Sequence, residues 1–463
     1  MGHTPTAGQR RAVVALERLL DTSKPNATLV LKGYAGTGKT TLVGALVQVL
    51  AQVGRPVVLL APTGRAAKVL AAYAGRPAST IHRRIYRMNG EEETGSGGMQ
   101  IAPNKETRAL FIVDEASMIG RSGLGEGPFG GRDLMKDLFQ HVFASDGSKL
   151  LLIGDPAQLP PVGSDHSPAL DPKELAGFGL LAGMVELTDV VRQASDSGIL
   201  VNATALRKAL SEEEPLPRFE SGYPDVIRLD GYDLQDALET AYGQDGDDEV
   251  CVICRSNKRA YQYSQQVRTR IHDHEEELCP GDRLMVVKND YYWAGRNGKP
   301  ELIANGEPIL VKRVGATEVV HGLRFADITT GWWNGQEERE LEVKVMLDVL
   351  ALEAPALPGS GMKAFREALF NSYSDLTKAQ RLKRLREDPY AQALQVKYAY
   401  AVTAHKAQGG QWNTVFVDQG YVTADMIDKE YVRWLYTAVT RASRRLYLLN
   451  FHPRFFGESM EGE

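Results

Sequence analysis

The sequence TLVLKGYAGTGKTTLVGALV occupies residues 28–47. Its β-branched and apolar start predicts a buried strand. The next eight residues, 33–40, match the pattern G-x-x-x-x-G-K-[ST], and the residues after them favour a helix. A phosphate-binding loop requires this order of strand, loop and helix, because its backbone N–H groups curl around phosphate oxygens beside a helix N-terminus. The stretch therefore predicts a nucleotide-binding α/β domain.

Several residues of this loop are candidate ligands of ATP and Mg²⁺. Lys39 would reach the β- and γ-phosphates, and the Thr40 hydroxyl would bind Mg²⁺. The loop and the start of the helix supply the other predicted nucleotide contacts: Gly33, Gly36, Thr37, Gly38 and Thr41. A chance glycine-rich turn is the alternative, and the flanking strand and helix argue against it.

Two later strands also end in polar residues. The apolar run at 109–113 is followed by Asp114 and Glu115, in the form of a Walker B site. Asp114 would bind Mg²⁺, and Glu115 would orient and deprotonate the attacking water. A further strand leads into GDPAQLPPVG at 154–163, where the amide of Gln158 is suited to sense the γ-phosphate. Ordinary solvated strand ends are the alternative, but three such strands indicate a parallel sheet with its ligand at the carboxyl edge.

An ordered set of motifs resembles the superfamily 1 helicases, in the branch of RecD-like and phage Dda-like proteins. The set runs from residue 4 to residue 442 in the order that the family keeps. It consists of Gln9 and the segments 33–40, 61–68, 79–82, 114–117, 154–163, 187–193, 403–409 and 436–442. The resemblance implies two RecA-like lobes with ATP in the cleft between them.

The resemblance also assigns roles to single residues around the nucleotide. It implies that Arg192 and Arg441 are arginine fingers, that Gln9 reads adenine, and that Gly409 adds to the nucleotide contacts. A guanidinium suits a finger because it is always charged and binds phosphate oxygens in a fixed fork. From the residues alone, a surface salt bridge explains each arginine better than a role as an arginine finger does.

The resemblance also implies nucleic-acid contacts, which are distributed over both lobes and the insertion in the second. They are Pro62, Thr63, Lys68, Thr80, His82, Asn257, Lys258, Asn305, Thr403, His405 and Lys406. Hydroxyls, imidazoles and lysines suit phosphates without reading bases, which is what a sequence-indifferent motor needs. Loop residues bonded to their chain neighbours are the alternative.

The predicted fold class is α/β. The resemblance implies two RecA-like P-loop lobes, a small pin inserted in the first lobe, and an SH3-like β-barrel with a helical insertion in the second. We assign 1–82 and 109–188 to the first lobe, 83–108 to the pin, 189–283 and 396–463 to the second lobe, and 284–395 to its insertion. The basic stretch at 378–386 fits either a solvated helical face or a DNA contact.

Composition limits the other function classes. The net charge of −5 counts weakly against a nucleic-acid partner, although a motor needs only a locally basic groove. No apolar run approaches the roughly 20 residues of a membrane span. The 3 cysteines argue against a disulfide framework and fit a reducing cytosol. The resemblance implies a cytoplasmic protein of a bacterium or phage. Cys251 and Cys254 lie in an apolar run, so core packing is favoured over a zinc site with His272, His274 and Cys279.

The sequence therefore predicts an ATP- and Mg²⁺-dependent DNA helicase that acts as a monomer. Its expected partners are single-stranded DNA, junctions of single and double strands, and single-strand-binding, replication or repair proteins. Movement from 5′ to 3′ is implied by the resemblance. Two alternatives stay open: an RNA-dependent helicase or ATPase of the same superfamily, and an ATP-switched loader or remodeller that does not unwind.

Overall fold

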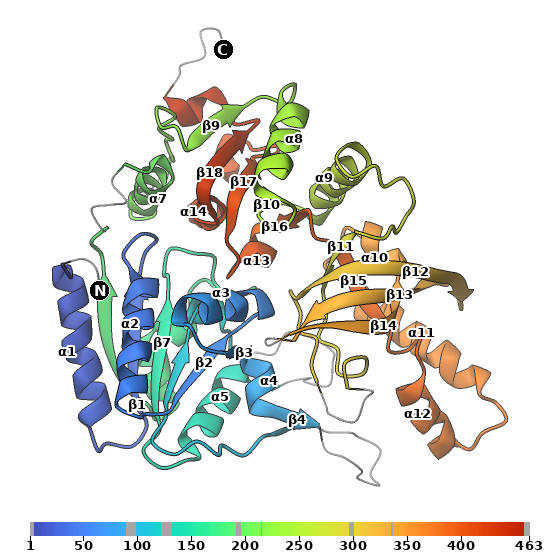
Figure 1. The fold of residues 1–463 in the computed structure, drawn as a ribbon, viewed down its shortest axis with the longest axis horizontal. Helices are drawn as coiled ribbons and strands as arrows, with labels where there is room; N and C mark the ends of the chain where they lie inside the picture. Colours follow the sequence, from blue (N-terminus) through green and yellow to red (C-terminus); the bar gives the residue numbers. More distant parts are fainter. Residues whose placement is uncertain are drawn as a thin grey trace.

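The computed structural model describes residues 4–88, 99–121, 132–190, 196–213, 215–295, 301–334 and 337–457. Its described strands form two parallel sheets flanked by helices, a closed barrel, and a two-stranded hairpin. In Figure 1 the two sheets lie one above the other, and the barrel lies beside them with α11 (Gly359–Ser372) and α12 (Lys378–Glu387) projecting away.

The first sheet carries the phosphate-binding loop. Its strands have the order β3-β2-β6-β7-β1-β8, and every neighbouring pair is parallel. Strands β6 and β7 are buried along their whole length, which explains why they appear in the sequence as unbroken apolar runs. The strands are β1 (Ala27–Gly33), β2 (Val57–Ala61), β3 (Ala78–Thr80), β6 (Leu110–Val113), β7 (Lys149–Gly154) and β8 (Leu181–Leu187).

Helices cover both faces of this sheet, and a short hairpin extends from it. The helices are α1 (Ala7–Asp21), α2 (Lys39–Gln52), α3 (Gly64–Ala74), α4 (Ile81–Ile85), α5 (Leu134–Phe143) and α6 (Pro172–Gly177). The hairpin pairs β4 (Tyr86–Met88) with β5 (Met99–Ile101) at the place predicted for the pin. The residues between these strands, 89–98, lie outside the described residues.

The second sheet has the order β16-β10-β17-β18-β9, again with parallel neighbours. Its strands are β9 (Val226–Leu229), β10 (Val250–Cys254), β16 (Ala401–Thr403), β17 (Trp412–Asp418) and β18 (Ala442–Leu449). Its helices are α7 (Gly198–Ala209), α8 (Leu234–Asp245), α9 (Asn257–Arg270), α13 (Ala404–Ala407) and α14 (Lys429–Val439).

The insertion in the second lobe is a closed barrel followed by helices. The barrel strands are β11 (Arg283–Val286), β12 (Pro308–Val320), β13 (Leu323–Trp333), β14 (Glu338–Met346) and β15 (Leu394–Tyr398). Helices α10 (Asp348–Ala351), α11 (Gly359–Ser372) and α12 (Lys378–Glu387) lie between β14 and β15. The barrel thus spans 283–398, slightly more than the expected 284–395. Two parallel lobes and one barrel confirm the predicted fold class.

The cysteines lie where packing rather than metal binding explains them. Cys251 and Cys254 are buried in β10. Among the described residues, His274, Cys279 and Asp282 are close enough together to hold an ion. However, the Arg268 guanidinium donates to both Asp282 oxygens, at 2.7 and 2.8 Å, and so already supplies the positive charge there.

In the part of the chain that the structure describes, no helix combines the length and the apolar character that spanning a bilayer demands.

Candidate nucleotide site and nucleic-acid interface

The phosphate-binding loop joins β1 to α2. Gly36 and Gly38 have φ of +73° and +79°, which an L side chain rarely adopts. No described side chain caps the N-terminus of α2, so the N–H groups of its first turn are available to an anion. The loop therefore fits a polyphosphate. The predicted nucleotide contacts between residues 33 and 41 lie at the end of β1, in this loop and in the first turn of α2.

The Lys39 side chain folds back into this loop. Its Nζ atom donates to the carbonyl oxygens of Gly33, at 2.5 Å, and Tyr34, at 3.0 Å. The same atom lies 4.0 Å from Oδ2 of Asp155, at the end of β7. The lysine is therefore held at the carboxyl edge of the sheet, where the third strand also ends.

The predicted magnesium site lies at the end of β6. Asp114 Oδ1 accepts the Glu115 N–H at 2.9 Å, and its Oδ2 accepts the hydroxyl of Tyr73, from α3. Thr40 is exposed at the start of α2. A carboxylate and a hydroxyl are oxygen ligands that Mg²⁺ prefers, so the donor set fits this ion. Sequence reasoning missed Tyr73, because no motif includes it.

Glu115 has the environment expected of a general base. Its φ of +52° is unusual for a residue with a side chain. Burial raises the Glu115 pKa, and the nearby charge of Arg441 opposes part of that rise. A raised pKa gives the carboxylate a higher proton affinity than an ordinary glutamate, as deprotonating water requires.

Arg441 reaches this site from the second lobe. It is buried, and its Nη1 atom lies 3.7 Å from Glu115 Oε1. Its guanidinium also donates to the carbonyl oxygens of Thr437 and Gly410, each at 3.1 Å, which fixes its direction. The other predicted finger, Arg192, lies outside the described residues.

The loop after β7 is held by the second lobe. The Leu159 N–H donates to Thr437 Oγ1 at 2.9 Å, and the Leu159 carbonyl accepts Gln408 Nε2 at 2.7 Å. Arg433 donates to the Pro156 carbonyl at 2.6 Å. The buried Oε1 atom of Gln158 has no hydrogen-bond partner among the residues that the structure describes. An unpaired buried acceptor beside the nucleotide loop is consistent with the predicted sensor role.

Gln9 belongs to the first lobe, and Gly409 belongs to the second. Gln9 is buried against the loop, where its Nε2 donates to the Thr37 carbonyl at 3.2 Å and its Oε1 accepts the Thr6 N–H. Both ends of the amide are thus engaged within the protein, and its contact with adenine stays a prediction. A Cβ atom at Gly409 would lie 2.6 Å from the Ala66 Cβ, so glycine permits the two lobes to touch there.

In the first lobe, the predicted nucleic-acid contacts cluster at two helix starts. Thr63 and Thr80 cap α3 and α4, and each hydroxyl accepts a backbone N–H at 3.2 Å. Burial lowers the His82 pKa to about 4, so this imidazole is neutral at pH 7. Pro62 is half-buried and Lys68 is exposed on α3. This cluster offers hydrogen bonds and only one formal charge.

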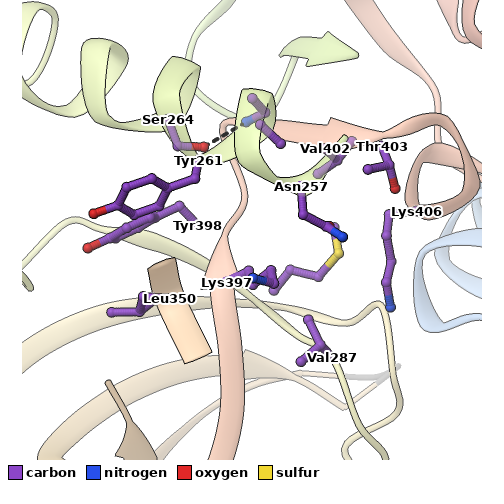
Figure 2. A pocket seen from close by; sticks show the side chains of 13 residues that line it. Asn257, Tyr261, Ser264, Val287, Leu350, Lys397, Tyr398, Val402, Thr403 and Lys406 are labelled. Atoms are coloured by element: carbon purple, nitrogen blue, oxygen red, sulfur yellow. Dashed lines mark hydrogen bonds between the residues drawn. The ribbon is translucent and has the colours of Figure 1, made fainter. Parts of the chain in front are cut away.

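In the second lobe, Asn257, Thr403 and Lys406 line one small cavity of about 30 Å³ (Figure 2). Lys406 Nζ donates to Asn305 Oδ1 at 2.6 Å, which joins α13 to the barrel insertion. Burial lowers the Lys406 pKa to about 8. The structure thus brings four predicted contacts together.

Two other predicted contacts lie apart from this cavity. His405 is largely exposed on α13, and partial desolvation of its imidazole lowers its pKa. Lys258 is exposed and pairs with Glu353 at 3.0 Å.

An ion pair between a half-buried arginine and a buried glutamate connects the first lobe to the barrel. Arg83 Nη2 lies 3.2 Å from Oε1 of Glu307, whose Oε2 accepts the Trp332 indole N–H at 2.6 Å. Arg83 also donates to the carbonyl oxygens of Leu302 and Asn334. The turn that contains Asn305 is therefore fixed against the first lobe.

Two family models match the chain. One describes an AAA domain and matches residues 4–214; the other describes a UvrD-like helicase C-terminal domain and matches residues 398–449. The chain is 26% identical over 448 residues to the ATP-dependent RecD2 DNA helicase of Deinococcus radiodurans, covering 93% of this chain and 48% of the relative. It belongs to superfamily 1 of the helicases. The family predicted from the motifs is thereby confirmed.

Further relatives of this superfamily 1 chain are also helicases by name. It is 34% identical over 119 residues to the ATP-dependent DNA helicase dda of Enterobacteria phage T4, covering 25% of this chain and 26% of the relative. A solved structure of Pif1 helicase from Bacteroides, in complex with ADP-AlF3 and ssDNA, is similar with a TM-score of 0.47 and 16% identity, covering 97% of this chain and 93% of that one. The superfamily 1 chain spans less than half the length of the RecD2 and Dda relatives that it matches.

Proposed function

We propose that this superfamily 1 chain is an ATP- and Mg²⁺-dependent motor that moves 5′ to 3′ on single-stranded DNA and unwinds duplex DNA. The observation that carries the proposal is the pair of Glu115 and Arg441, which face each other across the two lobes at 3.7 Å. A base from one lobe and a cation from the other act on one phosphate only when the lobes are closed. Hydrolysis is thereby coupled to lobe movement.

The chain's own residues would divide the chemistry as follows. Lys39 and the first-turn N–H groups of α2 would hold the phosphates, and Thr40 with Asp114 would hold Mg²⁺. When bound, Mg²⁺ neutralises charge on the phosphate oxygens. Glu115 would take the proton of the attacking water. Arg441 would stabilise the charge that develops on the phosphate from the opposite side.

The proposed DNA path crosses both lobes. It would contact Thr63 and Thr80 in the first lobe and Asn257, Thr403 and Lys406 in the second. Because the two groups belong to separate lobes, closing the cleft would change the distance between them and move one grip along the strand. The choice of DNA and the 5′-to-3′ direction rest on the likeness to RecD2 and Dda, because no described contact reads a 2′-hydroxyl.

Two assays test the proposal on the full chain. ATP hydrolysis is measured alone, with single-stranded DNA and with single-stranded RNA; unwinding is then measured on forked duplexes with a single 5′ or 3′ tail. We expect DNA to stimulate hydrolysis and only the 5′-tailed substrate to be separated. Lys39→Ala should abolish both activities. Stronger stimulation by RNA would indicate an RNA motor, and stimulation by DNA without strand separation would indicate a loader or remodeller.

A further inference from the structure

A tyrosine from the second lobe is inserted into the phosphate-binding loop of the first. The Tyr436 side chain projects from α14, and its hydroxyl accepts the Ala35 N–H at 2.9 Å. The same hydroxyl donates to Asp155 Oδ2 at 2.6 Å. Both the tyrosine and the aspartate are 1% exposed. One buried hydroxyl therefore links the loop after β1, the loop after β7, and the opposite lobe.

The partners of this hydroxyl belong to the nucleotide site. Ala35 lies within the loop at 33–40, and the Asp155 oxygen that accepts the hydroxyl is the one 4.0 Å from Lys39 Nζ. Any movement of Lys39 toward a phosphate changes the charge beside Asp155. Tyr436 brings a second-lobe hydroxyl into direct contact with this carboxylate.

The same segment of the second lobe carries the predicted arginine finger. Thr437, the next residue, binds the Leu159 N–H, and Arg441 follows the end of α14. The Arg441 Nε atom donates to the Thr437 carbonyl, which ties the finger to the helix turn that holds Tyr436. A shift at Tyr436 is therefore transmitted to Arg441 through a single helical turn.

We propose that Tyr436 is a positioning residue that docks α14 on the phosphate-binding loop and so aligns Arg441 for hydrolysis. This inference rests on the proposed ATPase function. Burial and the neighbouring Asp155 raise the pKa of the Tyr436 hydroxyl, so it stays protonated and able to donate throughout the working pH range. Tyr436 would act on the closed, hydrolysing state rather than on nucleotide affinity, because its partners are loop backbone and carboxylate.

The test compares Tyr436→Phe with Tyr431→Phe. Tyr431 is a matched control on the same helix: its buried hydroxyl accepts Gln419 Nε2 at 3.1 Å, entirely within the second lobe. Removing the Tyr436 hydroxyl takes away the acceptor of the half-buried Ala35 N–H and a donor to the buried Asp155 carboxylate, which predicts a roughly tenfold lower kcat for DNA-stimulated hydrolysis. The KM for ATP should change by less than about twofold, because the first lobe still holds the nucleotide. Y431F should keep the kcat of the wild type.

A second measurement needs no turnover. We expect Y436F to bind ADP as the wild type does, and to bind ADP with aluminium fluoride roughly tenfold more weakly, because that complex demands the closed cleft. If the melting temperature of Y436F falls further than that of Y431F, both affinities are measured again at a temperature where Y436F is folded, and a wild-type ratio of the two affinities there would overturn the role.

The two possible failures are distinguishable. If the proposed function is wrong, the wild type itself shows no DNA-stimulated hydrolysis, and the affinity comparison still tests Tyr436. If Y436F keeps both the wild-type kcat and the wild-type affinity for ADP with aluminium fluoride, the positioning role is overturned. Equal losses in Y436F and Y431F would also overturn it, because they would show a general effect on α14.

Discussion

Arg441 Nη1 lies 3.7 Å from Glu115 Oε1, so the cation of one lobe faces the carboxylate that ends a strand of the other. Burial would otherwise favour the protonated form of Glu115, and Arg441 opposes this effect. The arginine therefore has two functions in the proposed mechanism. It stabilises charge on the phosphate, and it keeps the base ionised.

Replacing the proposed finger should remove most of the turnover. We expect Arg441→Ala to lower kcat by roughly 10³-fold, within the range measured for arginine fingers. Arg441→Lys should not restore it, because an ammonium lacks the planar fork. Steady-state hydrolysis with saturating single-stranded DNA is the measurement. Arg444→Ala is the control, since that side chain is 71% exposed; a loss in R441A of less than tenfold would contradict the role.

The same pair predicts a pH dependence. Glu115 acts as a base only when it is unprotonated, so hydrolysis should fall as the pH drops through its raised pKa. Arg441→Gln removes the charge that lowers this pKa. The acid limb of the pH–rate profile should therefore move to higher pH. Single-turnover hydrolysis from about pH 5 to pH 9 measures the limb. An unshifted limb in R441Q would show that the arginine does not influence the ionisation of Glu115.

Tyr73 should control the affinity for magnesium. Its hydroxyl binds Asp114 Oδ2 and so orients the predicted ligand. We expect Tyr73→Phe to raise the Mg²⁺ concentration for half-maximal hydrolysis by roughly tenfold, as changes behind a metal ligand do. Tyr86→Phe is the matched control, because its hydroxyl binds Asp137 away from this site. Equal magnesium requirements in the two variants would contradict the assignment.

The sequence predicted the nucleotide loop and the carboxylates because these features are local. A central parallel strand is buried on both faces, so β6 and β7 appear as continuous apolar runs. The polar residues that end them, such as Asp114 and Asp155, must then meet at one edge of the sheet. The strand pattern, the loop motif and the spacing of the residues were sufficient to predict where this part of the site lies in the fold.

The contacts between lobes could not be predicted in the same way. Tyr436 meets Ala35, and Arg83 meets Glu307, only because separate segments fold against each other. No periodicity or spacing encodes such a pair. Tyr436 had one usable signal, its position in the motif at 436–442, but a tyrosine in an apolar helix is ordinarily interpreted as core.

Lys406 should make DNA affinity depend on pH. Its pKa of about 8 means that it is charged at pH 7 and neutral at pH 9. The affinity of the wild type for single-stranded DNA should therefore fall over this pH interval. The affinity of Lys406→Arg should fall less, because the arginine stays charged. Fluorescence anisotropy with labelled oligonucleotides is the measurement.

One neighbouring group could give the same pH effect. Lys397 lines the same cavity, and its pKa is also about 8. Its ammonium donates to the Val349 and Leu352 carbonyls, so it is engaged within the protein. Lys397→Arg should therefore keep the wild-type pH dependence. Identical pH profiles for wild type and K406R would contradict the role of Lys406.

Glu307 should hold the barrel against the first lobe. It is 5% exposed and binds both Arg83 and Trp332, so removing it leaves a guanidinium and an indole N–H with one acceptor fewer each. We expect Glu307→Ala to lower the free energy of unfolding by about 3 kcal/mol, as breaking a buried ion pair does. Denaturant unfolding followed by limited proteolysis of the barrel is the measurement.

Two further variants separate the ion pair from general disruption at Glu307. Glu353→Ala removes an exposed partner of Lys258 and should change stability by less than about 0.5 kcal/mol. Arg83→Met combined with Glu307→Gln should be more stable than Glu307→Ala, because no charge is left buried without its partner. If the double variant is as unstable as E307A, the loss comes from packing at this interface and not from the ion pair.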